Sequence, residues 1–160
     1  MSISRKVLES LNSLGVTLSA KPDFAIPTLP REITELDDEG LMDLFVQFTQ
    51  WNDHLSGARA IAVINEREAQ RLLDTVEAQA MLANWAGTKG DRVAVAKASI
   101  ATDSKVLELK EDLDTKYAFR KLLETRAENV ERDSQVVSRE LTRRTSDGGG
   151  LRARSRRFTT

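Results

Sequence analysis

The sequence between Asp91 and Arg144 reads DRVAVAKASIATDSKVLELKEDLDTKYAFRKLLETRAENVERDSQVVSRELTRR and contains neither proline nor glycine. These two residues disfavour a helix interior more than any others, so their absence predicts one very long helix. From Leu41 onward, only Gly57 interrupts the preceding stretch before the cluster Gly87-Thr88-Lys89-Gly90. We therefore expect an all-α fold in which two long helices form an antiparallel hairpin about a glycine turn.

Heptad spacing supports this expectation, because apolar residues at alternating steps of four and three form the seam of a coiled coil. In the first long helix the seam is Leu44, Phe48, Trp51, Leu55, Ala58, Ala62, Asn65, Ala69, Leu72, Val76 and Gln79. In the second helix one face carries Val95, Val106, Leu109, Leu113, Leu123, Ala127, Val130 and Val137. Lys116 and Arg120 fall on that same face, so the apolar stripe is interrupted there, either by an interface or by a mismatch.

The N-terminal part is predicted to be organised differently. Helical spacing of apolar residues indicates a short amphipathic helix at 3–14, and Gly15 suits its C-terminal cap. Three prolines then favour an extended strap over 16–36. The carboxylates of Asp37 and Asp38 suit the start of the first long helix.

These boundaries predict three segments. Residues 1–36 form the N-terminal helix and strap, 37–144 form the helical hairpin, and 145–160 form a flexible, arginine-rich tail after Gly148-Gly149-Gly150. Two antiparallel helices alone leave apolar side chains in water, so we expect a homo-oligomer.

Charge is distributed unevenly along the chain. The formal net charge is −1, but 138–160 hold seven arginines against Glu140 and Asp147, a net charge of +5, which leaves −6 on 1–137. An acidic body with a basic end is typical of a chain that binds a polyanion or an acidic protein surface.

The basic end supplies the candidate binding residues. Guanidinium groups bind phosphates, and an aromatic ring can stack on an unpaired base, so the pattern favours single-stranded nucleic acid. An acidic protein surface is the alternative partner, and arginines in the last turns of a helix also stabilise the helix dipole. The candidate nucleic-acid-binding residues are Arg139, Arg143, Arg144, Arg152, Arg154, Arg156, Arg157 and Phe158.

Residues suited to catalysis are scarce. Cysteine is absent and His54 is the only histidine, which excludes Ser/His, Cys/His and histidine-rich metal arrangements. The cluster Gly87-Thr88-Lys89-Gly90 lacks the spacing of a phosphate-binding loop. We therefore expect no enzyme activity, no cofactor and no metal. The N-terminus lacks a signal-peptide core and no apolar run is long enough for a membrane span, so the expected location is the cytoplasm.

Three blocks carry a resemblance to known proteins: Leu41–Trp51 (LMDLFVQFTQW), Trp85–Val93 (WAGTKGDRV) and Val137–Arg144 (VSRELTRR). They resemble blocks in small helical proteins of actinobacteriophages, a group mostly without assigned roles. More distantly, the layout of 35–145 is similar to the UvsY-type phage recombination mediators. That resemblance implies an oligomer that binds single-stranded DNA and helps to load a recombinase onto strands coated by single-strand-binding protein.

Only the basic positions at the end of the long helix are carried over from that family, onto Arg139, Arg143 and Arg144. The leading hypothesis is an oligomeric phage accessory protein that binds single-stranded DNA in recombination or replication. The alternative is a virion, assembly or packaging-associated coiled-coil protein whose basic tail binds an acidic subunit, located in the virion.

Overall fold

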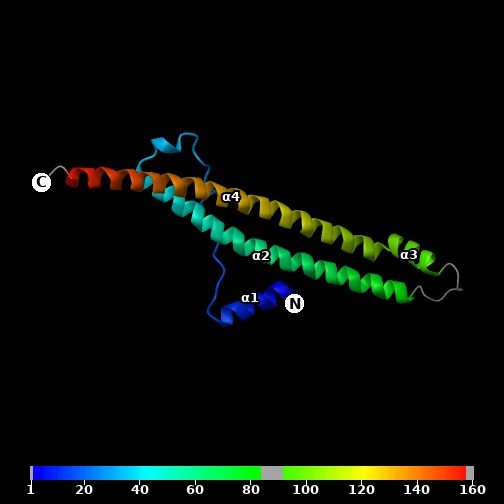
Figure 1. Ribbon diagram of the computed structural model, residues 1–160. Helices are drawn as coiled ribbons and strands as arrows, with labels where there is room; N and C mark the ends of the chain where they lie inside the picture. Colours follow the sequence, from blue (N-terminus) through cyan, green and yellow to red (C-terminus); the bar gives the residue numbers. More distant parts are fainter. Residues whose placement is uncertain (1, 84–91, 158–160) are drawn as a thin grey trace. The chain divides into compact units, whose positions relative to one another are not determined.

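The structure is a computed structural model that describes residues 2–83 and 92–157, and the side chains of 2–83 and 93–146 within them. This described part is all-helical and has no strand. Its elements are α1 (Ile3–Ser13), the 3-10 turn η1 (Ile33–Glu35), α2 (Asp38–Ala83), α3 (Arg92–Thr102) and α4 (Ser104–Arg157). Figure 1 shows α2 and α4 as the two long helices, which pack together. The predicted glycine turn at Gly87–Gly90 lies outside the described residues.

Packing groups the chain into two compact units. Unit 1 comprises Met1–Thr17 and Ala58–Glu124, and unit 2 comprises Leu18–Gly57 and Thr125–Thr160. The boundaries between the units therefore fall inside α2 and α4, because each long helix contributes one part to each core. The three-segment division at 36/37 and 144/145 rests on composition and stays a prediction.

The short helix α1 has well-defined ends. At its start the Ser2 hydroxyl accepts a hydrogen bond from the Arg5 N–H at 3.4 Å. At its end Gly15 has a φ of 74°, and the N–H groups of Gly15 and Val16 donate to carbonyls of the last turn. Glycine adopts this left-handed conformation at little cost in free energy, because it has no Cβ. The predicted short helix and its glycine cap are confirmed.

The start of α2 is also as predicted. Asp37 Oδ1 accepts a hydrogen bond from the Gly40 N–H at 2.8 Å, which satisfies one of the free amides of the first turn. Asp38 and Glu39 add negative charge at the positive end of the helix dipole. Before Asp37, the strap contains only the short turn η1, as its prolines require.

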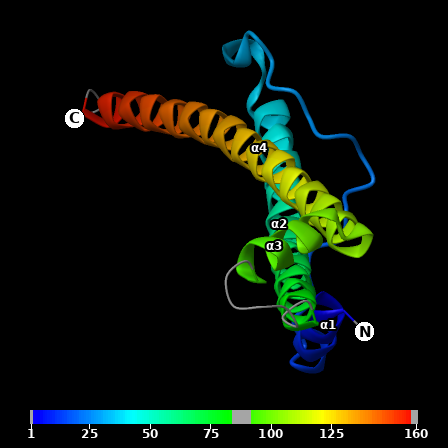
Figure 2. The same cartoon turned by 90° about the vertical axis from the view of Figure 1, so that its right-hand side faces the viewer.

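The second long helix is not continuous, and that prediction was wrong. Helix α3 ends at Thr102, and α4 begins at Ser104 after a break at Asp103. Asp103 Oδ1 accepts hydrogen bonds from the N–H groups of Lys105 at 2.8 Å and Val106 at 3.2 Å. When an aspartate side chain bonds to nearby backbone N–H groups, it stabilises the start of a new helix in place of a continuous one. A break can therefore form without proline or glycine. Figure 2 shows α3 and the start of α4 as separate helices.

Within unit 1, α2 runs antiparallel to α4. Arg59 of α2 pairs with Glu124 of α4 at 2.8 Å, and Glu77 pairs with Lys110 at 3.0 Å, so higher numbers on α2 meet lower numbers on α4. The core cluster of this unit consists of buried Leu73, Ile100 and Val106, packed by Val76, Ala80, Met81, Leu109 and Leu113.

The seam of α2 follows the predicted heptads only in part. Leu73 is 5% exposed and belongs to the core, whereas Leu72 is 51% exposed. Ala80 packs against the same core, and Gln79 is exposed. The predicted positions Leu72 and Gln79 are therefore wrong by one residue. An α-helix has about 3.6 residues per turn, so its buried face drifts by about 20° per heptad unless the helix supercoils.

Unit 2 has a core of larger side chains. Its buried hydrophobic residues are Leu41, Phe48, Trp51, Leu55, Ala127, Val130 and Val137. The strap contacts this core, since the rings of Phe24 and Trp51 meet edge to face at a centroid distance of 6.4 Å. His54 Nδ1 lies 3.1 Å from the carbonyl oxygen of Ser19. These contacts hold the strap against α2.

Helix α4 does not stop at the predicted boundary. It continues past Arg144 and through Gly148–Gly150 to Arg157. The flexibility expected of 145–160 stays a prediction. Glycine lowers helix stability by about 1 kcal/mol relative to alanine, but unlike proline it keeps its backbone N–H and causes no clash.

Candidate nucleic-acid interface

The candidate binding residues all lie in the C-terminal part of the chain, but the structure describes them to different extents. Arg139, Arg143 and Arg144 have described side chains on α4. Arg152, Arg154, Arg156 and Arg157 are placed on the same helix by their backbone alone. Phe158 lies outside the described residues.

Glu140 stands at the centre of the described basic residues and is only 8% exposed. Arg143 binds both of its oxygens, with Nε 2.8 Å from Oε2 and Nη2 2.7 Å from Oε1. Arg144 Nε adds a third hydrogen bond to Oε1 at 2.8 Å. Hydrogen bonds from Arg143 and then Arg144 favour the carboxylate and lower the pKa of Glu140 to about 2.

Arg144 is engaged within unit 2. Besides Glu140, its Nη1 lies 2.9 Å from Asp38 Oδ1, and its Nη2 donates to the Thr34 carbonyl oxygen at 3.1 Å. Its side chain is 19% exposed, and the hydrogen bonds to Asp38 and Glu140 raise the pKa of its guanidinium further. These contacts give Arg144 a structural role, since it ties α4 to η1 and to the first residue of α2.

Between 127 and 146, the exposed basic residues are Arg132, Arg139 and Arg143, of which Arg132 is not among the predicted binding residues. The Arg132 side chain is 69% exposed, and its Nε is 3.9 Å from Asp133 Oδ1. Arg139 is exposed as well. The Arg143 side chain is 55% exposed although it is bonded to Glu140. The seven-residue interval between Arg132 and Arg139 was a usable signal, because residues a heptad apart share one helix face.

The charged interruption on the inner face of α4 is a network within unit 1. Arg120 pairs with Glu66 of α2 and, at 3.1 Å, with Glu124 of its own helix. Arg59 also binds Glu124 at 2.8 Å. The hydrogen bond to Glu66 raises the pKa of Arg120, and the hydrogen bond from Lys121 lowers the pKa of Glu124. Arg120 therefore interrupts the apolar face of α4 as one member of an interhelical ion pair.

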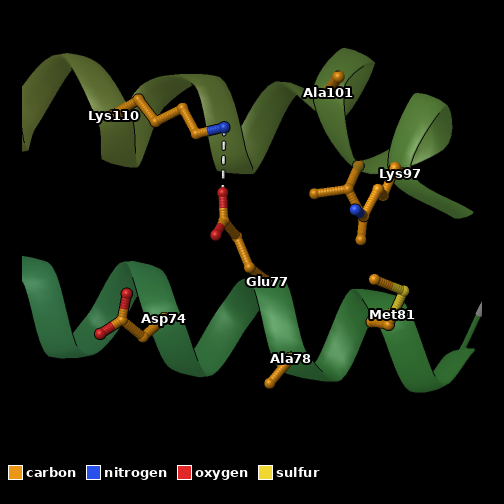
Figure 3. Close-up of a pocket in the computed structure, with 8 residues that line it drawn as sticks. Asp74, Glu77, Ala78, Met81, Lys97, Ala101 and Lys110 are labelled. Atoms are coloured by element: carbon orange, nitrogen blue, oxygen red, sulfur yellow. Dashed lines mark ion pairs between the residues drawn. The ribbon is translucent and has the colours of Figure 1, made fainter.

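Unit 1 also contains a groove with a volume of about 500 Å³. Figure 3 shows α2 on one side of it and α3 and α4 on the other, with Glu77 pointing toward Lys110. Its lining residues are Asp74, Glu77, Ala78, Met81, Lys97, Ile100, Ala101 and Lys110. The lining combines four apolar side chains with two carboxylates and two ammonium groups.

Within the part of the chain that the structure describes, no group of three or more His, Cys, Asp or Glu residues could hold a metal ion. No helix among those residues is both long and apolar enough to cross a membrane.

No protein-family model, curated protein or solved structure matches this chain.

Proposed function

We propose that this chain is a non-enzymatic, oligomeric accessory protein, built on an antiparallel helical hairpin, that binds single-stranded DNA through the basic end of α4. Its place would be in phage recombination or replication, in the cytoplasm of a bacterial host. The observation that carries the proposal is the continuity of α4 to Arg157, with exposed arginines before that end.

Helical geometry sorts the arginines into two groups. Each residue of an α-helix is rotated by about 100° from the one before, so positions 132, 139, 143, 154 and 157 fall within an arc of about 60°. Positions 144, 152 and 156 fall outside that arc. A strip of basic positions along one helix face can follow a phosphate backbone, and this supports contact with an extended nucleic-acid strand.

Arg144 is assigned a different role in this proposal. Because its donors bind Asp38, Thr34 and Glu140, we treat it as the anchor that fixes the last part of α4 in unit 2. The DNA-binding role then rests on the strip of five positions, with Phe158 as a stacking candidate.

The test uses a fluorescein-labelled single-stranded oligothymidylate and anisotropy at several salt concentrations. The variant R154E/R157E should bind at least about tenfold more weakly, and its affinity should depend less on salt, by about 0.7 in log–log slope per lost phosphate contact. The matched control is R71E/R67E, which makes the same charge change on the exposed side of α2. Equal loss in both variants would indicate a general charge effect, and no loss in either would refute the proposed interface.

A second candidate function is assembly, in which the basic end binds an acidic protein subunit in a virion or packaging complex. The observation that favours it is that Arg143 and Arg144 already bind carboxylates, those of Glu140 and Asp38. This function predicts the protein at fixed stoichiometry in purified particles and no binding to the labelled oligothymidylate.

A further inference from the structure

Unit 1 leaves much apolar surface exposed. Of the fourteen large hydrophobic residues that are exposed in the described parts of the chain, eleven belong to unit 1, among them Leu82, Val95 and Leu107. The buried residues of this unit include Ala62, Ala69 and Ala96, which contribute little buried area each. Unit 1 therefore buries little apolar area within itself, and burial of its exposed side chains against another chain would stabilise it.

The groove of unit 1 carries charged side chains on both of its sides. Asp74 and Glu77 come from α2, whereas Lys97 comes from α3 and Lys110 from α4. Glu77 and Lys110 pair with each other across the groove at 3.0 Å. Asp74 accepts a hydrogen bond from Gln70 Nε2 at 2.7 Å, and neither it nor Lys97 forms an ion pair with another described residue. One acidic and one basic group are therefore available on opposite walls.

We infer that this groove is the contact surface for a second copy of the same chain, in a two-fold symmetric dimer that pairs Asp74 of each protomer with Lys97 of the other. A two-fold interface is isologous, so a residue pair occurs twice and the surface must complement itself. Opposite charges on the two walls meet this requirement, whereas a polyanion or an acidic protein would meet one favourable wall and one repulsive wall.

The apolar part of the groove lining suits contact with the same surface of the second copy. Ala78 and Ala101 have small side chains, which let a facing helix approach closely, and Met81 can adapt its shape to the surface that meets it. The buried Ile100 also lines the groove. Apolar contact would supply the affinity, and the two Asp74–Lys97 pairs would fix the orientation.

The inference deepens the oligomeric part of the proposed function and is tested without DNA. Sedimentation velocity of the full chain should show a dimer. The variants D74K and K97E should each dissociate at least about tenfold more readily, because each would form two like-charged contacts per dimer. Circular dichroism checks that both variants keep the helicity of the wild type, and K105E is the control for a charge reversal at an exposed lysine outside the groove.

An equimolar mixture of D74K and K97E is the decisive sample. In a mixed dimer, the lysine introduced at position 74 of one protomer faces the glutamate introduced at position 97 of the other. The second contact keeps its native aspartate and lysine, so both contacts become attractive and dimers should return on mixing. No effect within a single chain can produce that recovery.

Three results would overturn the inference: a monomeric wild type, unchanged dimerisation of both variants, or no recovery in the mixture. The oligothymidylate measurement with R154E/R157E is a separate readout, so failure here leaves the DNA-binding proposal to its own test.

Discussion

Arg144 Nη1 lies 2.9 Å from Asp38 Oδ1, so an arginine of α4 is paired with the first residue of α2. The same guanidinium binds Glu140, which is buried and also accepts two hydrogen bonds from Arg143. Asp38 is largely exposed, and exposed ion pairs contribute little to stability. The buried carboxylate of Glu140 is therefore the member of this cluster whose charge matters most.

The pKa of Glu140 predicts how stability depends on pH. Folding lowers this pKa from its ordinary value of 4.5 to about 2, so the stabilisation is fully present above pH 4.5 and is lost as the pH falls toward 2. We expect E140Q to lower the melting temperature at pH 7 and to approach the wild type near pH 2. Thermal melts followed by circular dichroism at several pH values measure this, with E128Q as an exposed control on the same helix. Parallel pH profiles for wild type and E140Q would contradict the prediction.

Asp103 should contribute to stability as the N-cap of α4. Replacing it by alanine removes the acceptor for the N–H groups of Lys105 and Val106, a change that costs about 0.5 to 2 kcal/mol in comparable helices. Urea denaturation of D103A measures the loss. D103N keeps a side-chain oxygen at the same place and should retain most of the stability. A variant D103A as stable as the wild type would show that α3 and α4 do not depend on this cap.

The pair of Arg120 and Glu66 should behave as a half-buried ion pair. Changing either residue alone to leucine leaves the other charge without its interhelical partner, so E66L and R120L should each lower the melting temperature. The double variant E66L/R120L places two apolar side chains in the seam and should recover most of that loss. Additive losses in the double variant would mean that the two side chains do not interact in solution.

Local signals let the sequence predict several features correctly. The cap at Asp37, the glycine end of α1 and the absence of strands from the described residues all follow from short patterns whose physical causes act within a few residues. The break at Asp103 was missed because only proline and glycine were expected to end a helix. Asp103 is a weaker signal of a helix end than proline or glycine would be, since aspartate is also common on exposed helix surfaces.

The candidate interface was harder to predict, because its arginines differ only in their long-range contacts. Arg143 and Arg144 are neighbours of the same type, yet Arg144 reaches Asp38 and Thr34, which are more than 100 positions away in the sequence. Arg120 was noticed as a charge on an apolar face, but its partner Glu66 could be identified only after α2 and α4 were placed side by side. The composition identifies the basic end of the chain. The packing of the helices determines which of its arginine side chains can contact a partner.

Leu72 and Leu73 provide a matched test of the packing in unit 1, because they are adjacent residues of the same type with opposite environments. Leu73 is buried beside Ile100 and Val106, so L73A should lower the free energy of unfolding by about 2 to 5 kcal/mol. Leu72 is half exposed, and L72A should cost less than about 1 kcal/mol. Urea denaturation of the two variants under identical conditions gives the comparison, and both substitutions change helix propensity equally. If L72A proved the more damaging, the heptad seam predicted from the sequence would be the correct one, and α2 would present a different face to the core of unit 1.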